Sequence, residues 1–137
     1  MIERFLWIRY VISPIQACYN YAMHPTTENR PWGSFTRFTN NELSTVKILR
    51  INKGEEFSLQ YHTKRQEFWK LLSGSPEITV GDTVTRDPEI GTEFLIPPNT
   101  NHRISAPKDD VTVMEISTGE FDELDIVRLE DKYGRME

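Results

Sequence analysis

The sequence predicts an all-β domain, built as an antiparallel sandwich or barrel. Three observations lead to this fold class: the chain has many short runs with strand character, turn signals separate them, and no convincing helical window follows residue 30. At 137 residues the chain has the length of one domain and can bury a core without disulfides. Among such architectures the jelly-roll barrel closes around a central cavity, so we expect that form.

The first 29 residues form a segment of different composition, which we predict to be an N-terminal extension or arm. Asp and Glu are sparse from position 4 to 27 and common afterwards. The apolar run Phe5–Ile12 is interrupted by Arg9 and is too short to span a membrane. It also lacks the clear cleavage site of a signal peptide. Three interpretations stay open: an added strand or helix, a dimerisation arm, or sequence upstream of a natural start at Met23.

Residues 30–137 are predicted to form the barrel. The run Val46–Ile51 mixes apolar and basic residues, as a half-buried strand does. Turn signals lie at Asn40-Asn41, Lys53-Gly54, Ser73–Pro76, Gly81-Asp82 and Pro97–Asn99. The strands expected between them are Ser34–Phe38, Ser44–Ile51, Glu56–His62, Glu67–Ser73, Glu77–Val80, Thr83–Thr85, Thr92–Ile96, His102–Ser105, Val111–Ser117 and Leu124–Arg128.

Four residues that can bind a metal lie in two blocks of the predicted barrel, residues 54–74 and residues 91–102. Gln60 and His62 are two positions apart in a predicted strand, so their side chains face the same side. Glu67 opens the next strand, and His102 comes from a distant hairpin. The four side chains converge only if the sheet closes on itself. One amide, two imidazoles and one carboxylate suit a single divalent metal ion with positions left open.

Composition and charge exclude several function classes. The formal net charge is −5 and no long basic run is present, which disfavours nucleic-acid binding. Cys18 is the only cysteine, so an internal disulfide and a cysteine zinc cluster are excluded. A reducing, cytoplasmic setting fits this cysteine usage. An acidic chain can still bind an anionic small molecule if basic residues gather locally. The basic residues in or beside the two blocks are Lys47, Arg50, Lys64, Arg65, Arg103 and Arg128.

The two blocks resemble the two cupin motifs, with Gln60 in place of the first histidine of the common His-x-His pair. More specifically, residues 30 to 135 resemble the cupin domain of type II mannose-6-phosphate isomerases. The residues that carry this resemblance are Arg30–Ser34, Ser58–His62, Arg65, Glu67, Trp69, Ile96–Pro98, His102-Arg103 and Asp125–Arg135. The last block discriminates best, because generic cupins do not carry it. The resemblance implies a cupin double-stranded β-helix, the jelly-roll barrel expected above.

The resemblance also implies an activity: interconversion of mannose 6-phosphate and fructose 6-phosphate, in mannose, GDP-mannose and polysaccharide precursor metabolism. The ligand would be a sugar phosphate, with no nucleic-acid or membrane partner. The metal held by the four predicted ligands is expected to be zinc, although Mn, Fe, Co or Ni also suit such a set. A homodimer is expected, because pairing two chains covers the sheet edges that small barrels expose.

The isomerase hypothesis assigns phosphate binding and proton transfer to particular basic and acidic residues. Arg128 and Arg65 are the first choices for binding the substrate phosphate, because guanidinium groups bind phosphate bidentately. Arg103 and Lys47 are the second choices. Arg65 is alternatively expected to stabilise an enediolate. The proton-transfer candidates are Lys64 and Glu115.

The chain departs from its relatives at three positions. Lys64 and Phe68 stand where relatives often have histidine, and Asn99 stands where they usually have glycine. Many relatives are fused to a nucleotidyltransferase domain, so for these 137 residues only the isomerase half is implied. Two other functions stay open: a non-catalytic cupin that binds a sugar or sugar phosphate, and another metal-dependent cupin enzyme such as an iron dioxygenase.

Overall fold

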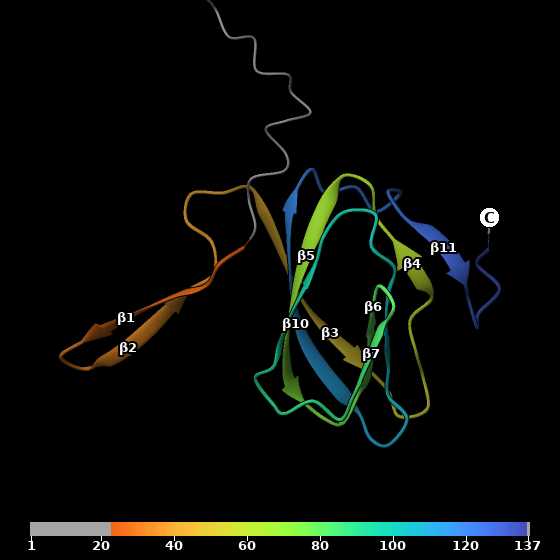
Figure 1. The fold of residues 1–137 in the computed structure, drawn as a ribbon, viewed down its shortest axis with the longest axis horizontal. Coiled ribbons are helices and arrows are strands. Elements are labelled where there is room, and N and C mark those ends of the chain that lie inside the picture. The colour runs from red at the N-terminus through yellow and green to blue at the C-terminus, as the bar shows by residue number, and fades with distance from the viewer. Residues whose placement is uncertain (1–22, 137) are drawn as a thin grey trace, which may run out of the picture.

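The computed structural model describes residues 23–136, and over this range it contains eleven strands and no helix (Figure 1). The all-β prediction is therefore confirmed. The strands are β1 (Thr26–Arg30), β2 (Gly33–Arg37), β3 (Ser44–Ile51), β4 (Leu59–Tyr61), β5 (Arg65–Ser73), β6 (Glu77–Val80), β7 (Thr83–Arg86), β8 (Glu93–Ile96), β9 (His102–Ser105), β10 (Val111–Gly119) and β11 (Val127–Glu130). Of the N-terminal extension or arm predicted over residues 1–29, residues 1–22 lie outside the described residues.

Nine of these strands form two antiparallel sheets that enclose the core. One sheet has the order β3-β10-β5-β8 and the other the order β11-β4-β9-β6-β7. Trp69, Leu71 and Val113 from the first sheet meet Ile78 and Ile104 from the second, and all five are buried. Because side chains alternate along a strand, each sheet gives one face to this shared interior.

Strands β5 and β10 divide the interior into an apolar end and a polar end. Their antiparallel register sets Val113 opposite Leu71 at one end, and Ser117 opposite Glu67 at the other. Glu115 shares the inward face with Val113, because the two residues are two positions apart. The same alternation that builds the core therefore carries carboxylates into the opposite end of the barrel.

Two turns next to these strands depend on the left-handed backbone conformation. Gly74 has φ 90°, and a Cβ there would lie 2.4 Å from the Asp110 carbonyl oxygen. Only glycine fits such an approach. Asn99 has φ 62°, and its N–H donates to the His62 carbonyl 2.7 Å away. Asparagine tolerates this conformation better than most residues, which explains how the chain departs from glycine here.

Phe68, the second departure, is part of a small apolar cluster on the outer face of the four-stranded sheet. It is buried together with Met23 and Ile116, and the Phe38 ring lies 5.6 Å from its own ring. The side chains of β5 alternate, so Phe68 points away from the interior that Glu67 enters. A phenylalanine at this position therefore belongs to packing on the outside of the barrel.

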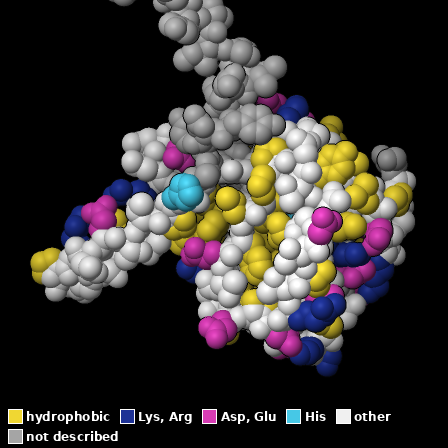
Figure 2. Space-filling model, in the orientation of Figure 1, with side chains coloured by type: hydrophobic (Ala, Val, Ile, Leu, Met, Phe, Trp, Pro, Cys, Tyr) yellow, Lys and Arg dark blue, Asp and Glu magenta, His cyan; other side chains and the backbone are white. Residues whose placement is uncertain are grey.

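Strand β1 was not predicted, because Thr26–Arg30 lacks an alternating apolar pattern. It pairs only with β2, and Figure 1 shows this hairpin standing away from the barrel. Trp32 at the turn is 71% exposed. Figure 2 shows hydrophobic atoms at the tip of the hairpin and charged side chains along its length, where Glu28 forms ion pairs with Arg30 and Arg37.

Several predicted strands differ from the observed ones by one or two residues at an end, and two differ more. The strand expected over Leu124–Arg128 is wrong in placement, since β11 begins at Val127. The preceding residues turn instead: the Asp122 carboxylate accepts from the Leu124 N–H at 2.9 Å. The strand expected over Glu56–His62 shortens to Leu59–Tyr61, and Glu56 contributes one isolated bridge to Ser105.

Candidate functional site

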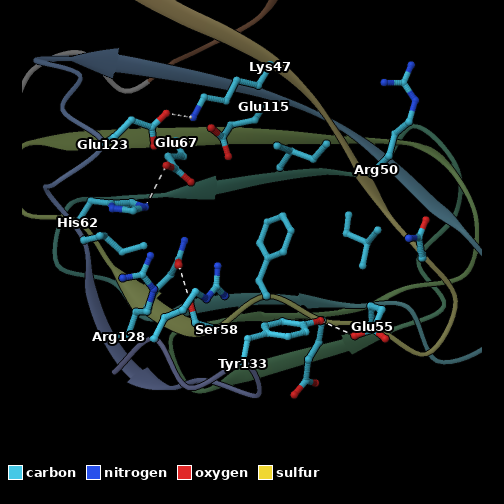
Figure 3. A pocket seen from close by; sticks show the side chains of 18 of the residues that line it. Lys47, Arg50, Glu55, Ser58, His62, Glu67, Glu115, Glu123, Arg128 and Tyr133 are labelled. Atoms are coloured by element: carbon cyan, nitrogen blue, oxygen red, sulfur yellow. Dashed lines mark hydrogen bonds and ion pairs between the residues drawn. The ribbon is translucent and has the colours of Figure 1, made fainter. Parts of the chain in front are cut away.

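A cavity of about 420 Å³ opens between the two sheets at the polar end of the barrel (Figure 3). Figure 3 shows Lys47, Glu67 and Glu115 on one wall, with Arg128 and Tyr133 on the opposite wall. Its carboxylates are Glu55, Glu56, Glu67, Glu115 and Glu123, and its cationic side chains are Lys47, Arg50, Arg65, Arg128 and Arg135. Charged side chains of both signs in one partly enclosed space suit a polar ligand.

Three of the four predicted metal ligands meet beside this cavity, and two of them, His62 and Glu67, line it. His62, Glu67 and His102 each offer a donor atom, and these atoms lie within 4.8 Å of one another. All three side chains are buried. The distance from His62 Nε2 to Glu67 Oε1 is 3.1 Å, and the distance from His102 Nε2 to Glu67 Oε2 is 3.6 Å.

Hydrogen bonds fix the tautomer of both imidazoles. His62 Nδ1 lies 2.6 Å from the Asp125 carbonyl oxygen, and His102 Nδ1 lies 2.8 Å from the Thr100 carbonyl oxygen. A carbonyl can only accept, so each ring carries its proton on Nδ1 and presents an Nε2 lone pair to Glu67. Burial lowers the pKa of His102, which also favours the neutral ring. A neutral imidazole oriented by its second nitrogen is the form that binds a metal.

Two polar atoms of this triad show whether its surroundings suit a cation. Among the described residues, Glu67 Oε2 and His102 Nε2 are buried without a hydrogen-bond partner. Burial alone would raise the pKa of Glu67, but the polar groups around it, with the Arg65 guanidinium among them, outweigh burial and lower that pKa. An ionised carboxylate oxygen and an imidazole lone pair therefore face each other. A divalent cation would satisfy both atoms, so the donor set fits a metal.

Gln60, the fourth predicted ligand, lies on the wall of the same cavity. It is opposite His102 in the register of β4 and β9. Its Oε1 accepts a hydrogen bond from Ser58 Oγ at 2.7 Å. The amide oxygen keeps a second lone pair, so this bond leaves it able to bind a cation as well.

Arg65 connects the triad to the loop that covers it. Its Nε donates to Glu67 Oε1 at 2.9 Å, and its Nη2 donates to His62 Nε2 at 3.0 Å. Its Nη1 donates to the Asp122 carbonyl at 3.0 Å, and its guanidinium lies 4.6 Å from the centre of the Phe121 ring. The side chain is buried, so it supplies a fixed positive charge beside the donor atoms.

Glu115 is a buried carboxyl group on the cavity wall. Trp69 Nε1 donates to its Oε2 at 3.2 Å, and Ser117 Oγ donates to its Oε1 at 3.4 Å. Burial and the nearby Glu67 charge raise the pKa of Glu115 to about 7, although the Lys47 ammonium opposes this. The group therefore gains and loses a proton near neutrality, as an acid–base catalyst must.

Two predicted phosphate-binding residues line the cavity. Arg128 projects from β11, and its Nε is buried without a hydrogen-bond partner among the described residues. Lys47 projects from β3, where its Nζ lies 3.0 Å from Glu123 and 4.4 Å from the centre of the Phe121 ring. Arg128 is thus the more available donor for a ligand, because Lys47 is already paired.

Two other predicted residues do not reach the cavity. Arg103 lies 2.9 Å from Glu130 and 3.5 Å from Glu56, outside the cavity lining. Lys64 is largely exposed and lies 3.3 Å from Glu120. The structure therefore does not bring either side chain to the triad.

The sequence analysis gave no role to several residues that line or order the site. Tyr133 lines the cavity, and its hydroxyl donates to Glu55. Lys132 Nζ reaches the same carboxylate oxygen at 2.9 Å. Asp125 accepts the hydrogen bond from His62. Asp125, Lys132 and Tyr133 belong to the C-terminal block that distinguishes the resemblance, which was the available signal.

Comparison with known proteins identifies the family of this chain. A family model described as "Mannose-6-phosphate isomerase C-terminal" matches residues 18–131. The chain belongs to this family. It is 37% identical over 108 residues to the xanthan biosynthesis protein XanB of Xanthomonas campestris pv. campestris strain B100, covering 77% of this chain and 23% of that protein. It is 30% identical over 132 residues to the mannose-1-phosphate guanylyltransferase ManC of Salmonella typhimurium, covering 94% of this chain and 27% of that protein. The chain thus spans about a quarter of the length of these relatives.

Solved structures confirm the fold. A double-stranded β-helix protein from Klebsiella pneumoniae superposes with a TM-score of 0.56 at 19% identity, covering 67% of this chain and 78% of that one. ChmJ, a 3′-monoepimerase from Streptomyces bikiniensis, gives a TM-score of 0.59 at 11% identity, covering 76% of this chain and 66% of that one. The barrel is therefore a cupin double-stranded β-helix, as the sequence resemblance implied. None of the residues described here forms a helix that could cross a membrane.

Proposed function

We propose that this chain is a metal-dependent isomerase that interconverts mannose 6-phosphate and fructose 6-phosphate. The observation that carries the proposal is a buried His–Glu–His donor set, two of whose members, His62 and Glu67, line the same cavity as Glu115, a carboxyl group whose pKa is about 7. Membership of the mannose-6-phosphate isomerase C-terminal family supports this substrate pair. The name of one relative, a xanthan biosynthesis protein, supports a role in polysaccharide biosynthesis.

His62, Glu67 and His102 would hold one divalent metal ion, with Gln60 as the fourth ligand. Zinc is the first metal to test, and Mn, Fe, Co and Ni also suit nitrogen and oxygen donors. Bound there, the ion would supply a positive charge that stabilises negative charge on the C1 and C2 oxygens of the sugar. Asp125 and Thr100 hold the two imidazoles in the required orientation through their carbonyl oxygens.

Glu115 would move the proton between the two carbons. As a carboxylate it would take the C2 proton of mannose 6-phosphate, and as the acid it would return that proton to C1, while a second proton passes from the C2 hydroxyl to the C1 oxygen. Both forms are populated near neutral pH because its pKa is about 7. Lys64, the other candidate, pairs with Glu120 away from the cavity, so the geometry favours Glu115.

Arg128 would bind the phosphate from the wall opposite Glu115. Its Nε is the buried donor without a protein partner, and a phosphate oxygen would satisfy it. Arg65 would hold the developing negative charge of the enediolate, since its guanidinium already lies beside the donor atoms. Lys47 adds positive charge to the same cavity.

A homodimer is part of the proposal. Among residues 23–136 the β1–β2 hairpin pairs only with itself, and an isolated two-stranded hairpin is marginally stable in water. β3 is an edge strand whose outer face exposes Val46 and Ile48. A second copy would cover both features. Light scattering at micromolar concentration tests this state, and a monomeric mass would contradict it.

The decisive experiment combines elemental analysis with a coupled assay of mannose 6-phosphate turnover. We expect one metal ion per chain and turnover that a chelator abolishes and added Zn²⁺ restores. His62→Ala should lose both, whereas Glu93→Gln, on the exposed outer face of β8, should lose neither. A fully loaded protein that binds the substrate without turnover would instead identify a non-catalytic sugar-phosphate-binding cupin.

A further inference from the structure

We propose that Asp125 is a positioning residue that fixes the His62 imidazole for metal binding. The inference rests on the metal site of the proposed function and adds a residue outside the donor set. Asp125 lies in the loop between β10 and β11, just before Val127 begins the last strand.

The end of β4 explains why His62 needs such support. His62 follows the three-residue strand Leu59–Tyr61, and β5 begins only at Arg65. The ladder between β4 and β9 consists of the single pair Gln60–His102. Residues 62–64 therefore lie between strands, where regular sheet hydrogen bonds do not hold their backbone.

Asp125 binds this segment with both its backbone and its side chain. Its carbonyl accepts the His62 Nδ1 proton at 2.6 Å. Its carboxylate accepts from Thr63 N at 2.9 Å, from Thr63 Oγ1 at 2.7 Å and from Lys64 N at 2.9 Å. One residue thus holds the ring and the two peptide groups that follow it. The carboxylate fixes where the carbonyl lies relative to the imidazole.

The loop that carries Asp125 is itself ordered. Asp125 N donates to the Asp122 carbonyl at 3.1 Å, and the same carbonyl accepts from Arg65 at 3.0 Å. Arg65 also donates to Glu67, so the loop and two metal ligands belong to one hydrogen-bonded unit. Loss of the Asp125 carboxylate would free the carbonyl to shift, and His62 Nε2 would lose its fixed direction.

A residue that merely stabilises the fold would behave differently, and Asp109 provides the comparison. Its carboxylate accepts from Ser75 N at 2.8 Å, a similar backbone contact in the connection that precedes β10. Asp125→Ala and Asp109→Ala each remove a carboxylate that binds backbone N–H groups. Only the first touches the segment that carries His62.

The test is a titration of the full chain with Co²⁺ after chelation, followed by its visible absorption spectrum. We expect Asp125→Ala to weaken Co²⁺ affinity about 10- to 100-fold and to change the spectrum, as loss of a residue that orients a ligand does. Asp125→Asn keeps one acceptor oxygen and should recover part of the affinity. Asp109→Ala should match the wild type. Wild-type affinity and spectrum in Asp125→Ala would overturn the positioning role alone, whereas a wild type that binds no Co²⁺ would overturn the metal site as well.

A second measurement needs no variant. Nitrogen NMR of the metal-free wild type should show the His62 ring protonated on Nδ1, because Asp125 accepts that proton. A ring protonated on Nε2 alone would overturn the proposal, even if Asp125→Ala fails to fold.

Discussion

Glu67 Oε2 and His102 Nε2 face each other across 3.6 Å, and neither has a hydrogen-bond partner among the described residues. One atom belongs to an ionised carboxylate and the other is the lone-pair nitrogen of a neutral ring. Both repel each other until a proton or a metal ion lies between them. This pair is therefore a position where a cation would be stabilised.

Replacing His102 by alanine should empty the metal site. The change removes one of three converging donors, so metal content should fall from about one ion per chain to a small fraction of that. Elemental analysis after dialysis against buffer with trace metal measures it. Glu93→Gln serves as the control, because Glu93 pairs with Lys70 on the exposed side of the barrel. Full occupancy in both His62→Ala and His102→Ala would refute the site.

Removing the metal should lower the thermal stability of the protein. A ligand that binds only the folded state stabilises it by about 2.7 kcal/mol when its concentration is 100 times its Kd. A chelator should therefore lower the Tm of the wild type by several degrees. His102→Ala should show no such response, and an equal drop in that variant would argue against metal linkage at this site.

Replacing Glu115 by glutamine should separate catalysis from metal binding. Turnover should fall about 10²- to 10⁴-fold, as for loss of a general base, while metal content stays at the wild-type level. The wild-type rate should decline as the pH falls below about 7, because the carboxylate becomes protonated. A pH profile of kcat/KM measures this. An unchanged rate in Glu115→Gln would return the proton-transfer role to Lys64.

The same variant should change the pH dependence of stability. The pKa of Glu115 is raised in the folded state, so its ordinary unfolded value is lower. The folded state therefore binds the proton more tightly, and stability is lost as the pH rises from about 4.5 through about 7. Glu115→Gln should remove this loss and gain at most about 3 kcal/mol at pH 8 over the wild type. Urea unfolding of the chelated proteins at pH 4 and pH 8 tests the sign.

Phosphate recognition should depend on Arg128. Arg128→Ala should reduce kcat/KM about 10- to 100-fold, which corresponds to about 1–3 kcal/mol for one charge-assisted contact. Arg128→Lys should recover only part of the loss, because an ammonium cannot replace the planar fork. Arg86→Ala is the matched control, since Arg86 forms an exposed ion pair with Glu77. Equal kinetics in all three variants would place the phosphate elsewhere.

The fold and most of the site could be predicted because both follow local patterns. The two-residue spacing of alternating strands predicted that Gln60 and His62 share a side, and the turn residues separated the strands. Strand β1 gave no such pattern, since most of its residues are exposed, whereas its partner β2 was expected over Ser34–Phe38. The sequence also could not predict that the side chains of Lys64 and Arg103 lie outside the cavity. A charged residue next to a motif can be expected to lie near the site, but the strand register decides whether its side chain enters the cavity.

The role of Asp125 could not be predicted for a different reason. Its contact to His62 uses a backbone carbonyl, which every residue type has, across 63 positions of sequence. No side-chain chemistry in the sequence indicates such a bond. The resemblance identified the C-terminal block, and in the structure Asp125 of that block binds His62 and the two residues after it.

The two ends of strands β5 and β10 impose different selective pressures on neighbouring positions. Leu71 and Val113 lie in well-packed apolar surroundings, where substitutions cost folding energy. A few residues away, Glu67 and Glu115 keep charge in the interior at a cost to stability. Apolar replacements of Glu67 and Glu115 would raise the free energy of unfolding of the barrel but remove the groups that could do chemistry. Along either strand, substitutions should therefore change from causing loss of folding to causing loss of function within about two to four residues. Descendants of this barrel could acquire new chemistry at the polar end without a change in the apolar core.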